Sequence, residues 1–248
     1  MRANGARRYG AVLLLLTAAF TFAMIAPGGG WPHVVTALLQ GGAALAALWG
    51  ARASSLLLAL GVAAVTLTVG MAGWAAFGSR YQAGLSDLAG AGLLVLVPAG
   101  IVVDVRRHLA VTLQSVLAAL CVYVVLGMLF ASVASAVSAI ADAAYFANRP
   151  SANASDYMYF SFVTLATVGY GDYVPALRLG RAMAVLEGLA GQLYLVTVVA
   201  LLVSNLGRPR RSVDDSPIAS DARSRAGGID GRSQEQRHPP GSQAGGPQ

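Results

Sequence analysis

Nine residues in the C-terminal half of the chain, T-L-A-T-V-G-Y-G-D from Thr164 to Asp172, bring hydroxyl groups, two glycines and an aspartate together between long apolar stretches. A loop can replace the water around a cation only if it offers oxygen atoms in successive layers. Aligning consecutive carbonyls requires backbone angles that most side chains forbid, and Gly169 and Gly171 adopt them without steric cost. The motif therefore predicts a cation site whose oxygens are the Thr167 hydroxyl and the backbone carbonyls of Thr167, Val168, Gly169 and Tyr170.

The composition indicates that this motif belongs to an integral membrane protein. Of the 248 residues, 56% are hydrophobic and 11% are charged, which leaves too little polar surface to cover a soluble globule. All 17 basic residues are arginines, and they gather near the ends of apolar stretches, so the net charge of +6 favours lipid headgroups over nucleic acid as the partner. The single cysteine, Cys121, lies in an apolar stretch and is expected to be a packing residue.

Six apolar stretches are long enough to cross a hydrocarbon core of about 30 Å as helices. We expect them at residues 9–26, 34–50, 55–77, 88–105, 109–135 and 177–206. The motif lies between the last two, and irregular backbone at membrane depth is tolerated only where protein buries it or water reaches it. A re-entrant loop is therefore expected there, preceded by a short helix over residues 157–166 that Ser155 or Asp156 caps.

The distribution of arginines predicts that both termini are cytoplasmic and that the chain is a multi-pass protein of the cell membrane. Nine arginines would lie in inner segments, against four, Arg80, Arg149, Arg178 and Arg181, at the outer side. A cleaved signal peptide is the alternative for the first apolar stretch, and it would leave the remaining topology unchanged. Residues 207–248 have almost no large apolar side chains and are expected to form a disordered cytoplasmic tail.

The motif resembles a known family. Residues 167–172, T-V-G-Y-G-D, match the selectivity filter of potassium channels, and the preceding short helix is similar to their pore helix. The resemblance covers roughly residues 109–206, and it implies an all-α membrane fold of six transmembrane helices with a re-entrant pore helix and filter loop between the last two. Residues 1–108 would then be a four-span region and residues 109–206 the pore domain.

The resemblance also implies what the protein does. It implies passive, potassium-selective conduction without an enzymatic step or a cofactor, with K⁺ as the permeant ion at the oxygens named above. One filter strand supplies one oxygen per layer, and a cage around the ion needs four, so a homotetramer is expected. Two classes compete with this interpretation: a secondary transporter, whose sign would be interrupted spans in two related halves, and a non-conducting regulatory subunit.

The surroundings of the filter differ from those of the two-span bacterial members of the family. A glutamate that supports the filter in those channels corresponds to Val163, and the usual threonine before the filter is Ala166. An aromatic partner for the filter aspartate corresponds to Tyr159, whose hydroxyl is expected to reach Asp172. These departures leave the supporting hydrogen bonds of the filter open.

The last apolar stretch carries two further candidates. Glu187 lies ten residues into it, and we expect this carboxyl group to face the short helix, to accept a hydrogen bond from Thr164 or a tyrosine there, and to support the filter. The alternative is a structural, hydrogen-bonded glutamate. Gly191 corresponds to the family's hinge glycine, and it begins a stripe expected to line the inner cavity, with Leu195, Val199 and Val203.

The sequence does not predict voltage sensing. A voltage sensor needs several arginines at three-residue spacing within one span, so that they do work when they move through the field. The stretch at residues 88–105 contains none, and Arg106 and Arg107 are adjacent at its end.

Overall fold

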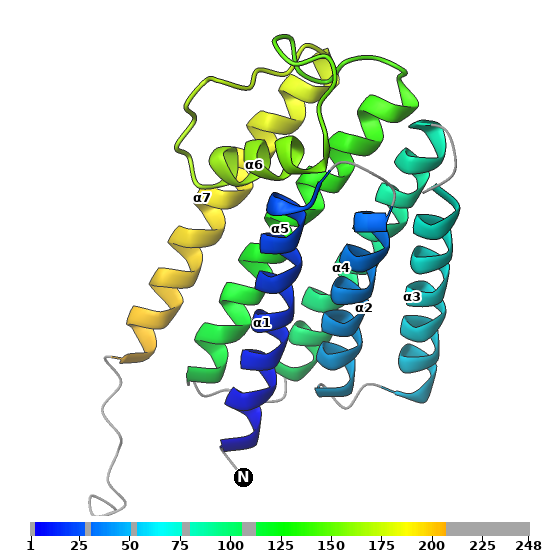
Figure 1. The fold of residues 1–248 in the computed structure, drawn as a ribbon. Helices are drawn as coiled ribbons and strands as arrows, with labels where there is room; N and C mark the ends of the chain where they lie inside the picture. Colours follow the sequence, from blue (N-terminus) through cyan, green and yellow to red (C-terminus); the bar gives the residue numbers. More distant parts are fainter. Residues whose placement is uncertain (1–2, 28–30, 51–53, 76–79, 106–112, 207–248) are drawn as a thin grey trace, which may run out of the picture. The chain divides into compact units, whose positions relative to one another are not determined.

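A computed structural model describes residues 3–27, 31–50, 54–75, 80–105 and 113–206. These residues contain seven helices and no extended strand (Figure 1). The helices are α1 (Ala3–Ile25), α2 (Trp31–Gly50), α3 (Ser55–Ala75), α4 (Arg80–Val105), α5 (Leu113–Ile140), α6 (Ala154–Leu165) and α7 (Arg178–Leu206). The described part of the chain is therefore all-α, as the sequence predicts.

Five of these helices, α2, α3, α4, α5 and α7, are long and apolar enough to cross a membrane. The apolar part of α1, Tyr9–Ile25, is shorter than the other five. Most helix ends lie within a few residues of the expected ones. The expected tail at residues 207–248 lies outside the described residues, and the division at residue 108 remains a prediction.

Helix α4 is the main exception, because it begins at Arg80, eight residues before the expected start. The polar residues up to Asp87 led to the prediction that the first two turns of α4 form a loop. In the structure the Asp87 carboxylate accepts a hydrogen bond from the Ser135 hydroxyl of α5 at 2.5 Å, and one of its oxygens lies 3.9 Å from His33 Nδ1 of α2. A carboxylate with partners on neighbouring helices can be placed inside the bundle, which hydropathy alone does not predict.

Helices α1 to α4 pack against one another and reach α5 through α1 and α4. Small residues allow the close approach of α4 and α5, since a Cβ at Gly84 would lie 2.5 Å from the Ala139 Cβ. Leu16, Val97 and Met128 are fully buried in the shared core. The four N-terminal helices thus form a bundle that holds α5 along its length.

The short helix α6 packs against α5, α7 and α1 (Figure 1). Phe162 on α6 stacks with Phe20 on α1 at a centroid distance of 4.5 Å. A Cβ at Gly127 of α5 would lie 2.7 Å from the Phe162 ring, so a larger residue there would displace this ring. These contacts fix α6 between the N-terminal bundle and the last helix, and α6 in turn positions the loop that follows it.

Candidate functional site

Helix α6 begins with a capping box. The Asn153 side chain accepts from the Asp156 backbone N–H at 3.1 Å, and the Asp156 carboxylate accepts from the Asn153 N–H at 2.8 Å. The prediction that Ser155 or Asp156 caps the helix is therefore wrong, and the helix begins three residues earlier than expected. The signal was present in the sequence, because a side-chain acceptor followed three residues later by a carboxylate is typical of a capping box.

The end of α6 is bonded to the start of the filter loop, which we define as residues 167–172. The Thr167 N–H donates to the Thr164 carbonyl at 2.9 Å, and the Val168 N–H donates to the Val163 carbonyl at 2.9 Å. Thr164 and Val163 therefore hold the loop by their backbone oxygens. Since these bonds need no particular side chain, valine at position 163 is compatible with this support of the loop.

The backbone angle φ alternates in sign along the filter loop. Thr167, Gly169 and Gly171 have φ of 57°, 56° and 78°, whereas Val168 and Tyr170 between them have negative φ. Such alternation is the backbone conformation that a row of carbonyl oxygens on one side of a loop requires. No atom lies within 4 Å of a Cβ built at Gly169 or Gly171. Glycine is therefore needed at these two positions for conformation and not for space.

Thr167 takes up the same left-handed conformation without being a glycine, which costs about 1 to 3 kcal/mol. The hydrogen bond from its N–H to Thr164 fixes this conformation. Reasoning from the sequence located the strain at the two glycines and missed the third position. A threonine at such a position retains a hydroxyl next to the aligned carbonyls, and an exposed hydroxyl oxygen is itself a cation ligand.

A cluster of polar contacts, which we call the outer brace, holds the far end of the filter loop. The Asn148 amide donates to the Asp172 carbonyl oxygen. The Tyr159 hydroxyl is hydrogen bonded to the Asp172 carboxylate, and this bond raises the pKa of Tyr159. The Tyr173 hydroxyl donates to Asp156 Oδ1 at 2.7 Å, which likewise raises the pKa of Tyr173. The outer brace therefore joins Asp172 and Tyr173, at the end of the filter loop, to α6.

Asp156 is the centre of the outer brace, and the sequence had indicated it only as a helix cap. Besides Asn153 and Tyr173, it contacts Arg149, whose Nε lies 3.2 Å from Asp156 Oδ2. The Arg149 guanidinium also lies over the Tyr173 ring, 5.8 Å from its centroid. A carboxylate with three different partners is stable although it is buried.

Backbone bonds and aromatic packing reinforce the outer brace. The Ala147 N–H donates to the Val174 carbonyl at 2.9 Å, and the Ala176 N–H donates to the Tyr145 carbonyl at 2.7 Å. The segments on either side of the filter loop are thus paired. Rings from both segments and from α6 pack edge to face with centroids 5.0 to 6.1 Å apart, among them Tyr145, Phe146, Phe160 and Tyr173.

Glu187 of α7 faces α6, but its partner differs from the expected one. Its carboxyl group is hydrogen bonded to the Ser161 hydroxyl, and its partner is neither Thr164 nor a tyrosine. Both residues are buried, with Glu187 3% exposed. Ser161 lies three residues before Thr164, and a helix places side chains at this spacing on the same face, so choosing among neighbouring hydroxyls required the structure.

Gly191 lies against the end of α6. A Cβ at this position would collide with the Leu165 carbonyl oxygen and would lie 3.0 Å from Leu165 Cδ1. The expected stripe is therefore divided, because Gly191 is buried against α6 whereas Leu195, Val199 and Val203 are exposed in a single chain. Steps of four residues advance by about 40° around a helix, which moves the later members of the stripe away from α6.

All six residues of the filter loop are exposed in a single chain. Val168 is 51% exposed and Tyr170 is 71% exposed. Helix α7 also presents many exposed apolar side chains, among them Leu186, Leu189, Leu193 and Val196. The arginines expected in inner segments at Arg106, Arg107, Arg208, Arg210 and Arg211 lie outside the described residues.

Comparison with known proteins finds matches in the region of the chain that contains the filter loop. Residues 118–208 match the family model described as "Ion channel", which covers most of α5 together with α6, the filter loop and α7. The inward rectifier potassium channel Kirbac3.1 of Paramagnetospirillum magnetotacticum is 36% identical over 59 residues, which are 24% of this chain and 20% of that protein. The match thus spans about a fifth of the relative's length. No solved structure matches the chain significantly. The two matches support an ion-channel family for the C-terminal part of the chain, with a potassium channel among the proteins similar to it.

Proposed function

We propose that the chain is the subunit of a homotetrameric, potassium-selective channel that conducts passively. The observation that carries the proposal is the alternating sign of φ along the filter loop, directly after a short helix, which would allow its carbonyl oxygens to line up. This geometry lies inside the segment that matches an ion-channel family. It supplies oxygen ligands without a titratable group, as a site for a weakly held permeant ion requires.

In this proposal each layer of ligands contains one oxygen from each of four chains. The layers are formed by the backbone carbonyls and one hydroxyl, from Thr167, Val168, Gly169 and Tyr170, and K⁺ passes from layer to layer. The C-terminus of α6 adds a partial negative charge next to the loop, which favours a cation. The outer brace and the bond between Ser161 and Glu187 support the loop from behind.

The exposed side chains of a single chain support assembly into a tetramer. Val168 and Tyr170 belong to the filter loop and yet are 51% and 71% exposed. In a fourfold assembly, neighbouring copies of α6 and α7 would cover them and part of the apolar surface of α7. Leu195, Val199 and Val203 would then line the inner cavity, and Gly191 would allow α7 to bend.

We further propose a six-span arrangement in the cell membrane, with α1 as the additional span and both termini cytoplasmic. Helix α4 has no lysine or arginine after Arg80 at its first position. The field across the membrane would therefore find no ladder of charges to move, and open probability should change little with voltage.

Recording from the purified protein in planar bilayers tests the proposal. With K⁺ and Na⁺ on opposite sides, unitary currents should reverse near the potassium equilibrium potential. Coupled flux without unitary current would indicate a secondary transporter, and neither flux nor current would indicate a regulatory subunit. Unitary currents that do not distinguish K⁺ from Na⁺ would contradict selectivity while leaving the channel itself in place.

A further inference from the structure

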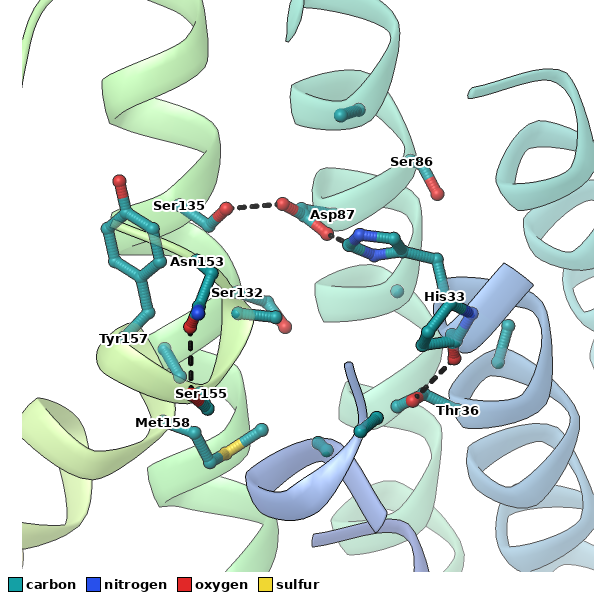
Figure 2. A pocket seen from close by; sticks show the side chains of 18 of the residues that line it. His33, Thr36, Ser86, Asp87, Ser132, Ser135, Asn153, Ser155, Tyr157 and Met158 are labelled. Carbon is teal, nitrogen blue, oxygen red and sulfur yellow. Dashed lines mark hydrogen bonds and ion pairs between the residues drawn. The ribbon is translucent and has the colours of Figure 1, made fainter. Parts of the chain in front are cut away.

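A cavity of about 280 Å³ lies apart from the filter loop, between the N-terminal parts of α2, α4 and α6 and the C-terminal part of α5. Figure 2 shows His33 and Thr36 on one side of it, Asp87 and Ser135 on another, and the first turn of α6 below them. Its size is close to the lower end of the range for small-molecule pockets, about 300 to 1,000 Å³. Polar groups line it although the surrounding helices are apolar.

Most hydroxyl groups of the cavity wall have already donated their only hydrogen to the protein. Their acceptors lie at 2.5 to 2.9 Å and are the Pro32 carbonyl for Thr36, the Ala64 carbonyl for Thr68, Asp87 for Ser135, the Ala143 carbonyl for Ser138 and Asn153 Oδ1 for Ser155. Each of these hydroxyls offers only lone pairs to the cavity. Ser86 and Ser132 have no such bond among the described residues and can turn either way. The wall is therefore rich in acceptors.

The charge of the wall also favours a ligand that donates hydrogen bonds. Its titratable side chains are His33 from α2, Asp87 from α4 and Tyr157 from α6, while α1, α3 and α5 contribute none among the described lining residues. Asp87 is the one acidic side chain among the described lining residues, so its ionised carboxylate gives the cavity a negative group that a cation can pair with. The distance of 3.9 Å between His33 Nδ1 and Asp87 Oδ1 leaves that oxygen without a hydrogen bond to the imidazole.

Gln40 adds an amide group to the wall of the cavity. Its side chain lines the cavity, is 5% exposed, and has no hydrogen-bonding partner among the described residues. Since no buried side-chain nitrogen or oxygen among the described residues lacks a hydrogen-bond partner, the amide atoms of Gln40 are open to the cavity, where a bound molecule can reach them. A molecule in the cavity would therefore meet an amide as well as a carboxylate and several hydroxyl oxygens.

We propose that this cavity binds a primary ammonium group carried by a small hydroxylated molecule, such as ethanolamine or the ethanolamine headgroup of a lipid. The ammonium has three hydrogens to donate, which fit Asp87 Oδ1 and the lone pairs of neighbouring hydroxyls such as Ser135 and Thr36. The hydroxyl or ester oxygen next to it can bond to Gln40. Free amine and lipid headgroup share this chemistry, and the experiment distinguishes them.

The position of the cavity connects the ligand to the pore. Ser155, Tyr157 and Met158 from the first turns of α6 form part of its wall. A bound ammonium would join α4 to α2 and α5 through Asp87, Thr36 and Ser135, and α5 packs against α6, which carries the filter loop. This consequence for conduction rests on the proposed channel function, whereas binding itself does not.

Binding is measured on the full chain in nanodiscs of phosphatidylcholine by titration with protonated ethanolamine in a calorimeter. We expect saturable binding that Asp87→Asn weakens about tenfold or more, because the ion pair is lost while the shape is kept. Asp142→Asn is the matched control: Asp142 is exposed, lies outside the cavity wall, and has φ of 46°, which asparagine tolerates. It should leave binding unchanged. Thermal unfolding verifies that both variants fold.

Further measurements probe each part of the proposal. Gln40→Leu should weaken binding without changing charge, and the neutral N-acetylethanolamine should not bind. Equal binding of ethanolamine by wild type and Asp87→Asn, or of the neutral analogue by wild type, would overturn the proposal.

Native mass spectrometry of protein from nanodiscs that contain phosphatidylethanolamine identifies the source. Retention of this lipid by the wild type and its loss in Asp87→Asn would support the lipid headgroup, and ethanolamine binding in phosphatidylcholine alone would support the free amine. Neither result would contradict the site. These binding measurements do not depend on conduction. If the protein binds ethanolamine but carries no K⁺ current in planar bilayers, the channel function is refuted and the binding site is not.

Discussion

The Ser161 hydroxyl of α6 lies within hydrogen-bonding distance of two oxygens, the Gly127 carbonyl at 2.6 Å and the Glu187 carboxyl group. A serine hydroxyl has one hydrogen to donate, and a carbonyl has none. Both contacts are satisfied together when Ser161 donates to Gly127 and a neutral Glu187 donates to Ser161. The pair therefore favours a neutral carboxyl group that joins α7 to α6 behind the filter loop.

Replacement of Glu187 tests this pairing. Glu187→Gln should unfold at nearly the wild-type temperature, because an amide can donate to Ser161 as a neutral acid does. Glu187→Ala should lose roughly 1 to 3 kcal/mol of unfolding free energy, from the lost bond and the space left behind. Thermal unfolding in detergent measures both. If Gln costs as much as Ala, the carboxyl group is needed in its charged form and the pairing described above is wrong.

Two glycines with open space around them separate conformation from packing. A Cβ at Gly169 and a Cβ at Gly70 of α3 would each meet no atom within 4 Å, but only Gly169 has positive φ. Gly169→Ala should therefore strain the filter loop by about 1 to 2 kcal/mol and abolish K⁺ selectivity. Gly70→Ala should leave selectivity unchanged and stabilise α3 by up to about 1 kcal/mol. Reversal potentials in bilayers compare the two, and selective currents from Gly169→Ala would show that the alternating backbone is dispensable.

The sequence predicted the helices and the filter motif because both depend on local rules. Apolar length defines a helix that can cross a membrane, and Gly169 and Gly171 indicate the backbone angles of the loop. The start of α4 was placed too late for a reason that is not local. Asp87 is acceptable inside a helix bundle only because Ser135, 48 residues further along the chain, donates to it.

The outer brace illustrates the same limit at the candidate site. Tyr159 was predicted from the family resemblance, and the structure places it beside Asp172. Asn148 and Tyr173 lie in segments without periodicity, and only the fold brings them to the filter loop and to Asp156. The N-x-x-D spacing of Asn153 and Asp156 was readable in the sequence, but the competing hydroxyl of Ser155 made the choice of cap ambiguous.

Removal of one hydroxyl from the outer brace should loosen the mouth of the filter. Tyr173→Phe deletes the donor to Asp156 Oδ1 and keeps the ring packed on Phe146. We expect a loss of about 1 kcal/mol in unfolding free energy, together with faster decay of K⁺ current during sustained recording. Tyr81→Phe is the matched control, since Tyr81 is exposed on α4 and lies away from the brace. Equal effects in the two variants would show that the brace does not support the filter.

The outer brace also predicts a pH dependence. The pKa of Tyr173 is raised mainly by the hydrogen bond to Asp156, and that of Tyr159 mainly by the hydrogen bond to Asp172. A raised pKa means that the neutral phenol is favoured in the folded state. The contribution is therefore complete below the ordinary tyrosine pKa of about 10 and is lost as the pH rises through the folded-state value. Unfolding temperatures between about pH 8 and pH 12 should fall less steeply in Tyr173→Phe than in wild type, and parallel curves would contradict the assignment.

Gly191 has two possible roles, close packing of α7 on α6 and bending of α7, and one substitution distinguishes them. An alanine Cβ there would collide with the Leu165 carbonyl oxygen, which belongs to the backbone and cannot turn away. We expect Gly191→Ala to force α7 away from α6 and to cost roughly 1 to 3 kcal/mol in unfolding free energy, with a disturbed filter as a result. Gly10→Ala on α1 is the control, since a Cβ at Gly10 meets no atom within 4 Å. If Gly191→Ala keeps the wild-type unfolding temperature while its open probability falls, bending of α7 is the reason for this glycine. A fall in unfolding temperature, with K⁺ selectivity weakened in the channels that remain, assigns it to the contact with Leu165.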